Sequence, residues 1–284
     1  MSALISPDDL LDRLDDVVVV DVQYHLGAVG KGRDDYERAH LPGAHHVDLD
    51  AELAGPPGPG GRHPLPTAHS VQAALRRCGV DADTRVVVYD QGACTAAARA
   101  WWVFGYYGLG FVQVLDGGLA AWTGAGGPVS RQVPPPGAGT FEAHAGGMPL
   151  LDADGAAEVA RLGVLLDARS TERWAGETEP IDPVAGHIPG AVSAPTVDNM
   201  GPDGRFRPQH ELRERFTALG VRPGRPVGTY CGSGVTAAHQ ALALHEIGVE
   251  TPVYVGSWSH WITDPGRPVA TGRTPSQPTR RAAR

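Results

Sequence analysis

One cysteine, Cys231, lies in a short glycine-bearing loop where its chemistry and its position suit a nucleophile. The apolar run from Val227 to Tyr230 predicts a buried strand before it, and residues 237–247 have the apolar spacing of a helix. Backbone N–H groups at such a strand-to-helix turn lack helical partners and can point at an anion, which favours a thiolate. A free cysteine is more often a small buried hydrophobe. The flanking Gly232 and Gly234 favour a reactive thiolate instead.

The composition excludes several other classes of protein. A net charge of −8 over 284 residues gives no reason to expect a nucleic acid or an anionic membrane as partner. No apolar run is long enough to span a bilayer, and residues 1–16 lack the pattern of a signal peptide. The 3 cysteines are sparse and odd in number, which predicts a reducing, cytoplasmic environment without a disulfide framework. Their spacing does not suit zinc, so we expect no metal.

The elements that would position Cys231 recur twice along the chain. Short Val- and Leu-rich runs without polar alternation predict strands covered on both faces, with helical patterns between them. The architecture is therefore α/β, with two tandem domains that each contain a mainly parallel sheet flanked by helices. We place the domains at residues 1–125 and 148–273, with a Pro- and Gly-rich linker at 126–147 and a disordered tail at 274–284.

The two halves differ at the strand end that carries the cysteine. Ligands of parallel α/β sheets bind beyond the carboxyl ends of the strands, and Cys231 follows such an end. In the first half the equivalent residue is Asp90. Because a carboxylate cannot replace a thiolate as a soft nucleophile, we expect the N-terminal domain to be catalytically silent.

The chain resembles the tandem rhodanese-domain sulfurtransferases over nearly its whole length. The matching segments are Asp-Ala-Arg at 167–169, His-Ile-Pro-Gly-Ala at 187–191, the cysteine loop, and Gly-Ser-Trp-Ser-His-Trp at 256–261, with His-Leu-Pro-Gly-Ala at 40–44 and Leu-Asp-Gly-Gly-Leu at 115–119 in the first half. The resemblance implies that Cys231 takes a sulfane sulfur from a small-molecule donor as a persulfide. A thiophilic acceptor (cyanide, a thiol or a thioredoxin-like protein) would then remove it, without metal or organic cofactor.

The resemblance also implies which residues bind the reacting groups. Backbone N–H groups of the loop would hold the negative charge, and they belong to Gly232, Gly234, Val235 and Thr236. In the thiosulfate-specific members this loop resembles Cys-Arg-Lys-Gly-Val-Thr. The loop of this chain, Cys-Gly-Ser-Gly-Val-Thr, looks like that of the 3-mercaptopyruvate sulfurtransferases. In that family a loop serine is linked to a histidine and an aspartate, which match Ser233, His63 and Asp50 here. Mercaptopyruvate is therefore the first choice of donor and thiosulfate the second. The alternative for His63 is an exposed loop histidine without a role in the site.

Arginines suit the carboxylate and ketone of mercaptopyruvate. Arg173 matches the first substrate arginine of the family. The second should lie shortly before His187, but residues 179–187 contain no arginine. Arg99 either reaches an interdomain cleft or pairs with a local carboxylate. Arg169 is expected to be structural, bonded to its own loop.

Two rival functions compete with sulfur transfer. A cysteine phosphatase requires an arginine after five intervening residues, and Ala237 stands at that position. A non-catalytic rhodanese-like module that binds a partner protein would not need Cys231 in an intact loop. Both rivals are therefore disfavoured.

Overall fold

The computed structural model describes residues 2–274, so residues 275–284 of the predicted disordered tail lie outside the described range. The chain forms two compact units. Unit 1 contains residues up to 56, 65–149 and 200–207, and unit 2 contains residues 57–64, 150–199 and those from 208 onward. Each unit thus includes a short segment from the other half of the sequence. The predicted boundaries of the domains and of the linker stay predictions.

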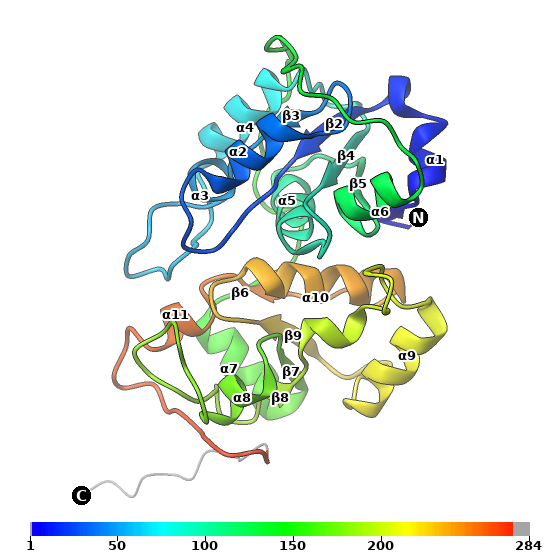
Figure 1. The fold of residues 1–284 in the computed structure, drawn as a ribbon. Coiled ribbons are helices and arrows are strands. Elements are labelled where there is room, and N and C mark those ends of the chain that lie inside the picture. Colours follow the sequence, from blue (N-terminus) through cyan, green and yellow to red (C-terminus); the bar gives the residue numbers. More distant parts are fainter. Residues whose placement is uncertain (1, 275–284) are drawn as a thin grey trace, which may run out of the picture. The chain divides into compact units, whose positions relative to one another are not determined.

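Unit 1 contains a parallel sheet of five strands in the order β1-β5-β4-β2-β3, with helices packed around it (Figure 1). Its strands are β1 (Leu4–Ile5), β2 (Val18–Asp21), β3 (His45–His46), β4 (Val86–Tyr89) and β5 (Val112–Leu115). Its helices are α1 (Pro7–Leu11), α2 (Lys31–Arg38), α3 (Leu49–Glu52), α4 (Ala68–Arg77), α5 (Thr95–Tyr106) and α6 (Gly118–Gly124), with a 3-10 turn at Leu14–Asp16.

Unit 2 repeats this topology, with strand order β6-β10-β9-β7-β8 and all neighbours parallel. Its strands are β6 (Leu150–Leu151), β7 (Val164–Asp167), β8 (Val192–Ser193), β9 (Val227–Tyr230) and β10 (Val253–Tyr254). Its helices are α7 (Ala153–Leu162), α8 (Thr171–Ala175), α9 (Gln209–Ala218), α10 (Val235–Glu246) and α11 (Ser257–Trp261), with a 3-10 turn at Thr196–Asn199. The predicted α/β class, with two mainly parallel sheets flanked by helices, is confirmed.

The core of unit 2 packs against the end of β9, directly before the cysteine. On one face of the sheet, Leu165 and Tyr230 pack with Ala156 of α7 and Trp258 of α11. All four side chains are buried, and each large apolar one contributes on the order of 2 kcal/mol. Helix α10 is buried along most of its length, so both elements that flank the loop are held by packing.

Side-chain caps explain where two helices begin. The apolar pattern predicts helices from Ser70 and from Ala156, whereas α4 begins at Ala68 and α7 at Ala153. Thr67 accepts the N–H of Ser70, and the Asp152 carboxylate accepts the N–H of Gly155. Such caps satisfy the first free N–H groups and let α4 begin two residues and α7 three residues earlier than the apolar signal indicates.

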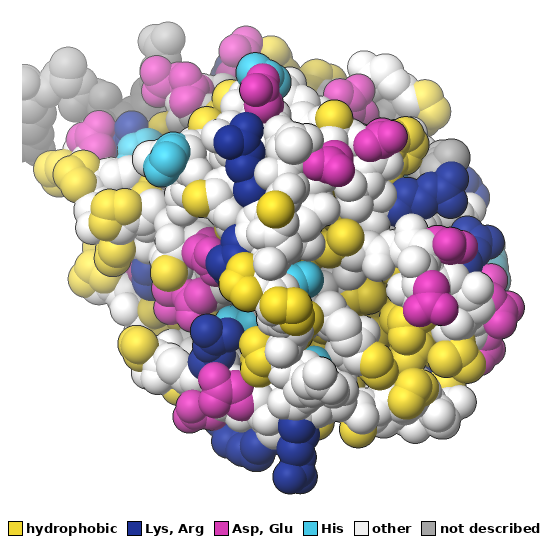
Figure 2. Space-filling view, turned by 90° about the horizontal axis from the view of Figure 1, so that it is seen from above, with side chains coloured by type: hydrophobic (Ala, Val, Ile, Leu, Met, Phe, Trp, Pro, Cys, Tyr) yellow, Lys and Arg dark blue, Asp and Glu magenta, His cyan; other side chains and the backbone are white. Residues whose placement is uncertain are grey.

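Among residues 2–274 no helix combines the length and apolarity needed to cross a membrane. Figure 2 shows one face of the molecule, on which Lys and Arg side chains are interspersed with Asp and Glu side chains. Neither sign of charge gathers into an extended field on that face.

Candidate active site

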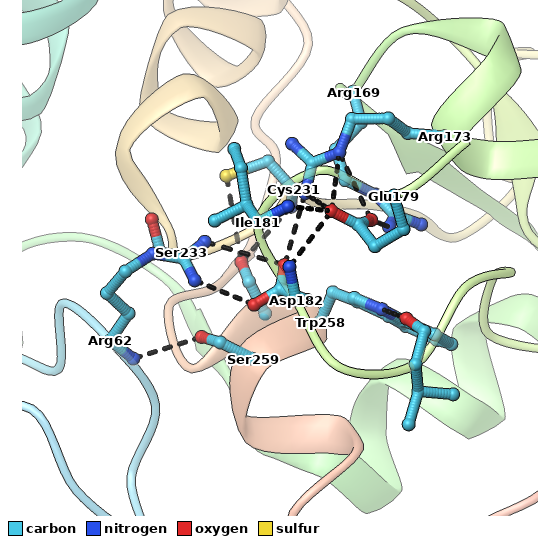
Figure 3. Close-up of polar contacts among 12 residues, drawn as sticks. Arg62, Arg169, Arg173, Glu179, Ile181, Asp182, Cys231, Ser233, Trp258 and Ser259 are labelled. Carbon is cyan, nitrogen blue, oxygen red and sulfur yellow. Dashed lines mark hydrogen bonds and ion pairs between the residues drawn. The ribbon is translucent and has the colours of Figure 1, made fainter. Parts of the chain in front are cut away.

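Cys231 occupies the first position after β9, and its side chain is buried (Figure 3). The backbone N–H of Gly234 donates to Sγ of Cys231 at 3.0 Å. Gly234 has a φ of +86°, a left-handed conformation that favours glycine, and it directly precedes α10. The sulfur therefore lies beside a helix N-terminus, whose partial positive charge stabilises an anion.

Residues at the start of α11 form hydrogen bonds with the backbone of the cysteine loop. Ser257 is fully buried, and its Oγ accepts the N–H of Cys231 at 3.1 Å and donates to the carbonyl of Tyr254 at 2.8 Å. The N–H groups of Trp258 and Ser259 donate to the carbonyls of Cys231 and Gly232, each at 2.9 Å. These bonds hold the loop backbone against α11.

The predicted pair of His63 and Ser233 meets within unit 2. Nδ1 of His63 lies 2.7 Å from Oγ of Ser233, and both side chains are buried. His63 is therefore not an exposed loop histidine. It reaches this position because residues 57–64 belong to unit 2. Asp50 lies in α3 of unit 1, and its link to His63 stays a prediction.

Arg173 projects from α8 toward the cysteine loop (Figure 3). Its Nη2 donates to Glu179 at 2.7 Å and to Asp182 at 3.1 Å, and it would lie 3.5 Å from a Cβ placed on Gly232. Burial opposes ionisation of Glu179, but bonds from Arg173 and from the backbone N–H groups of Asp182 and Ile181 outweigh it and lower the pKa of that carboxyl. Glu179 is thus a carboxylate at neutral pH.

A second arginine beside the loop, Arg62, is absent from the sequence-based site. Its Nη1 donates to Oδ1 of Asp182 at 2.6 Å, and its Nη2 would lie 3.3 Å from a Cβ on Gly232. The only signal for it in the sequence is that it directly precedes His63. The stretch where a second arginine was expected contributes two carboxylates instead, Glu179 and Asp182.

The other two arginines considered from the sequence, Arg169 and Arg99, have partners within their own units. The guanidinium of Arg169 is bidentate to Asp167, donates to the carbonyl of Gly186 and lies 4.9 Å from the ring of Trp258. These contacts agree with the predicted structural role of Arg169. In α5 of unit 1, Arg99 is fully buried and donates to the carbonyl of Leu53 at 3.2 and 3.0 Å.

The remaining thiols are poorly suited to reaction. Cys78, Cys94 and Cys231 are all free and buried. Burial raises the pKa of the Cys78 thiol to about 12, and burial followed by the nearby Asp90 raises the pKa of Cys94 well above its usual value. Both are therefore protonated at neutral pH. In residues 2–274 no group of three or more His, Cys, Asp or Glu side chains is arranged to hold a metal.

In unit 1 the position after β4 is occupied by Asp90, which is buried. Its carboxylate accepts the N–H groups of Gly92, Cys94, Ala96 and Ala97 at 2.9 to 3.3 Å. Burial raises the pKa of Asp90, and these four bonds oppose that shift. The loop N–H groups of unit 1 are therefore directed at a side chain of their own chain.

Comparison with known proteins identifies the family of the chain. The Rhodanese-like domain family model matches residues 6–125 and 150–264. A Pseudomonas aeruginosa protein named "Probable 3-mercaptopyruvate sulfurtransferase" is 46% identical over 282 residues, covering 95% of this chain and 98% of that protein. A Mycobacterium tuberculosis protein named provisionally as thiosulfate sulfurtransferase SseB is 43% identical over 266 residues, covering 91% and 92%.

The solved structures include SseA from Escherichia coli, described as a 3-mercaptopyruvate sulfotransferase with the rhodanese fold. It is 29% identical with a TM-score of 0.81, over 91% of this chain and 100% of that one. The predicted resemblance is confirmed, and neither rival function agrees with these relatives. The chain belongs to the rhodanese-like domain family and is a two-domain sulfurtransferase that uses small-molecule sulfur donors and acceptors.

Proposed function

We propose that the chain moves a sulfane sulfur from 3-mercaptopyruvate to a thiophilic acceptor through a persulfide on Cys231. The Cys231 thiolate attacks the donor sulfur, the C–S bond breaks, and its electron pair leaves on the enolate of pyruvate. The proton of the donor thiol passes to that enolate, which becomes pyruvate. An acceptor thiolate or cyanide then attacks the outer sulfur of the persulfide, breaks the S–S bond and restores the thiolate.

Loop N–H groups stabilise the charge at both steps. The bond from Gly234 to Sγ of Cys231 is 3.0 Å in the free protein. The neighbouring N–H groups of Gly232, Val235 and Thr236 are proposed to hold the outer sulfur of the persulfide anion. A cradle of this kind needs no reorganisation when the sulfur arrives, and it requires no cofactor.

The observation that carries mercaptopyruvate as donor is the 2.7 Å contact between His63 and Ser233 beside Cys231. A mercapto donor has an S–H proton that must move before pyruvate leaves, and a hydroxyl bonded to imidazole can transfer it. Thiosulfate has no such proton, because its sulfite leaving group takes the electron pair directly. Asp50 is proposed to orient His63 as the third member of this relay.

Charge supports the same donor. Arg62 forms an ion pair with Asp182. Arg173 forms ion pairs with both Asp182 and Glu179. The two cations and two anions offset each other, and the loop itself carries no charged side chain. Mercaptopyruvate brings one negative charge to this site, whereas thiosulfate brings two, so the dianion is the less favoured donor.

The acceptor is proposed to be cyanide, a small thiol or a thioredoxin-like protein. All of these attack the same outer sulfur. The three free thiols fit a reducing, cytoplasmic compartment, in which thiol acceptors are abundant.

Intact-protein mass spectrometry after brief exposure to each donor tests this function. We expect one added sulfur atom after mercaptopyruvate and little after thiosulfate, and none in the Cys231→Ser variant. Loading from thiosulfate alone would reverse the donor assignment. Absence of loading from both donors would reject the persulfide route.

A further inference from the structure

We propose that Arg62 binds the carboxylate of the sulfur donor, and so provides the second substrate arginine that residues 179–187 lack. This inference rests on the proposed mercaptopyruvate site and adds a residue to it. Arg62 comes from the 57–64 segment of unit 2, more than a hundred residues before the loop that it faces.

Two guanidinium groups converge on the uncharged residue beside the nucleophile. A Cβ placed on Gly232 would lie 3.3 Å from Nη2 of Arg62, and 3.5 and 3.6 Å from Nη2 and Nη1 of Arg173. Both guanidinium groups therefore lie close to the uncharged backbone of Gly232, the residue directly after the nucleophile.

Both arginines have N–H groups that could bind a ligand. Nε of Arg62 is buried and has no hydrogen-bond partner among the described residues. Within the same part of the chain, the hydrogen bonds of the Arg173 guanidinium come from Nε and Nη2 and leave Nη1 unused. Because buried N–H groups are normally satisfied, Nε of Arg62 in particular suits an oxygen-rich ligand.

Asp182 shows that the two cations can share one carboxylate. Its Oδ1 lies 2.6 Å from Nη1 of Arg62, and its Oδ2 lies 3.1 Å from Nη2 of Arg173 (Figure 3). In the absence of donor, this nearly buried carboxylate offsets the repulsion between the two guanidinium groups. The donor carboxylate would then bind to the N–H groups that Asp182 and Glu179 leave unused.

The backbone around Arg62 is built to hold it there. The N–H of Arg62 donates to Oγ of Ser259 at 3.0 Å. Gly61 has a φ of +108°, and a Cβ on it would lie 2.7 Å from the carbonyl of Gly256. Glycine at 61 thus permits the close approach to α11 that directs Arg62 toward the loop.

Steady-state kinetics of the full chain test the inference. For Arg62→Gln we expect the KM for mercaptopyruvate to rise about 10- to 100-fold with kcat within a few-fold, since one charged hydrogen-bonding partner is lost. Arg62→Lys should recover part of that loss. 1-Mercaptopropan-2-one, which lacks the carboxylate, should be used equally well by both proteins. Arg267→Gln is the matched control, because Arg267 is exposed to the same degree (23% against 24%) and likewise pairs with an aspartate, Asp264.

Binding of pyruvate by calorimetry separates this inference from the proposed function. In a Cys231→Ser background, Arg62→Gln should weaken pyruvate binding by a similar factor, whether or not mercaptopyruvate loads sulfur on the active chain. Unchanged KM and unchanged pyruvate affinity would overturn the role of Arg62, as would no pyruvate binding at all. An equal defect with the carboxylate-free donor would also overturn it, because that result indicates a structural role.

Discussion

The loops after β4 and β9 occupy the same place in two sheets of the same topology, but different side chains stand at their first position, Asp90 and Cys231. After β4, the Asp90 carboxylate accepts four backbone N–H groups of its own loop and helix. After β9, Sγ of Cys231 accepts one, from Gly234. Unit 1 thus directs its loop N–H groups at a permanent side chain, whereas those of unit 2 are proposed to bind a sulfur atom that arrives and departs.

The loops also differ in length and in what surrounds them. Four residues, the last of them Cys94 in the left-handed conformation, separate Asp90 from the start of α5. Three residues separate Cys231 from the start of α10. Unit 2 adds the His63–Ser233 pair and the two guanidinium groups near Gly232. Two units of the same topology therefore place different side-chain chemistry at equivalent strand ends.

The largest expected effect is removal of the proposed nucleophile, which should leave both units without sulfur transfer if unit 1 is silent as we propose. Cys231→Ser is expected to lower sulfur transfer by roughly 10⁴-fold or more, because hydroxyl oxygen does not form the persulfide. Adding Asp90→Cys to this variant should not restore activity, since the loop of unit 1 is longer and lacks the serine. Turnover of mercaptopyruvate measures the activity of the single and of the double variant. Recovery in the double variant would show that the loop sequence alone is sufficient.

A smaller effect is expected from the proton relay that unit 1 lacks. Ser233→Ala should lower kcat for mercaptopyruvate by about 10²-fold, because the donor proton loses its path. Loading from thiosulfate, which has no such proton, should change far less. Single-turnover rates with the two donors provide the measurement. Equal losses for both would mean that Ser233 shapes the loop rather than moves a proton.

Opening the cradle of unit 1 should affect stability rather than activity. Asp90→Ala leaves four N–H groups without their acceptor, and we expect a loss of roughly 2–4 kcal/mol in the free energy of unfolding. Urea denaturation measures this change. Asp15→Ala, at an exposed position of the same unit, is the control and should lie near the parent value. Similar values for the two variants would contradict the structural role of Asp90.

The smallest expected effect concerns the carboxylate beside Arg173. The folded pKa of Glu179 lies below its ordinary value of 4.5, so its ionisation stabilises the fold above that pH. This stability should be lost as the pH falls from about 4.5 through the folded pKa. Glu179→Gln should remove that part of the acid dependence and cost roughly 1 kcal/mol at neutral pH. Urea midpoints measured across acidic pH check it, and an unchanged profile would argue against it.

Much of the fold could be predicted because its signals are local. The Val-rich runs of β4 and the apolar periodicity of α4 and α10 indicate element type within a few residues. Strands of two residues, such as β3 and β8, have no periodicity to detect. Short helices such as α8 and α11 depend on capping and on packing against the sheet, and sequence periodicity is too brief there to reveal them.

The sequence by itself determined the repeated α/β architecture and the equivalent places of Cys231 and Asp90 at two strand ends, because strand, glycine loop and helix are consecutive in the chain. Only the tertiary structure decided which distant groups join that loop. His63 lies 170 positions from Ser233, and Arg62 faces Gly232 from the same segment. Spacing along a chain does not encode such contacts, since they depend on how the backbone of residues 57–64 packs against α11.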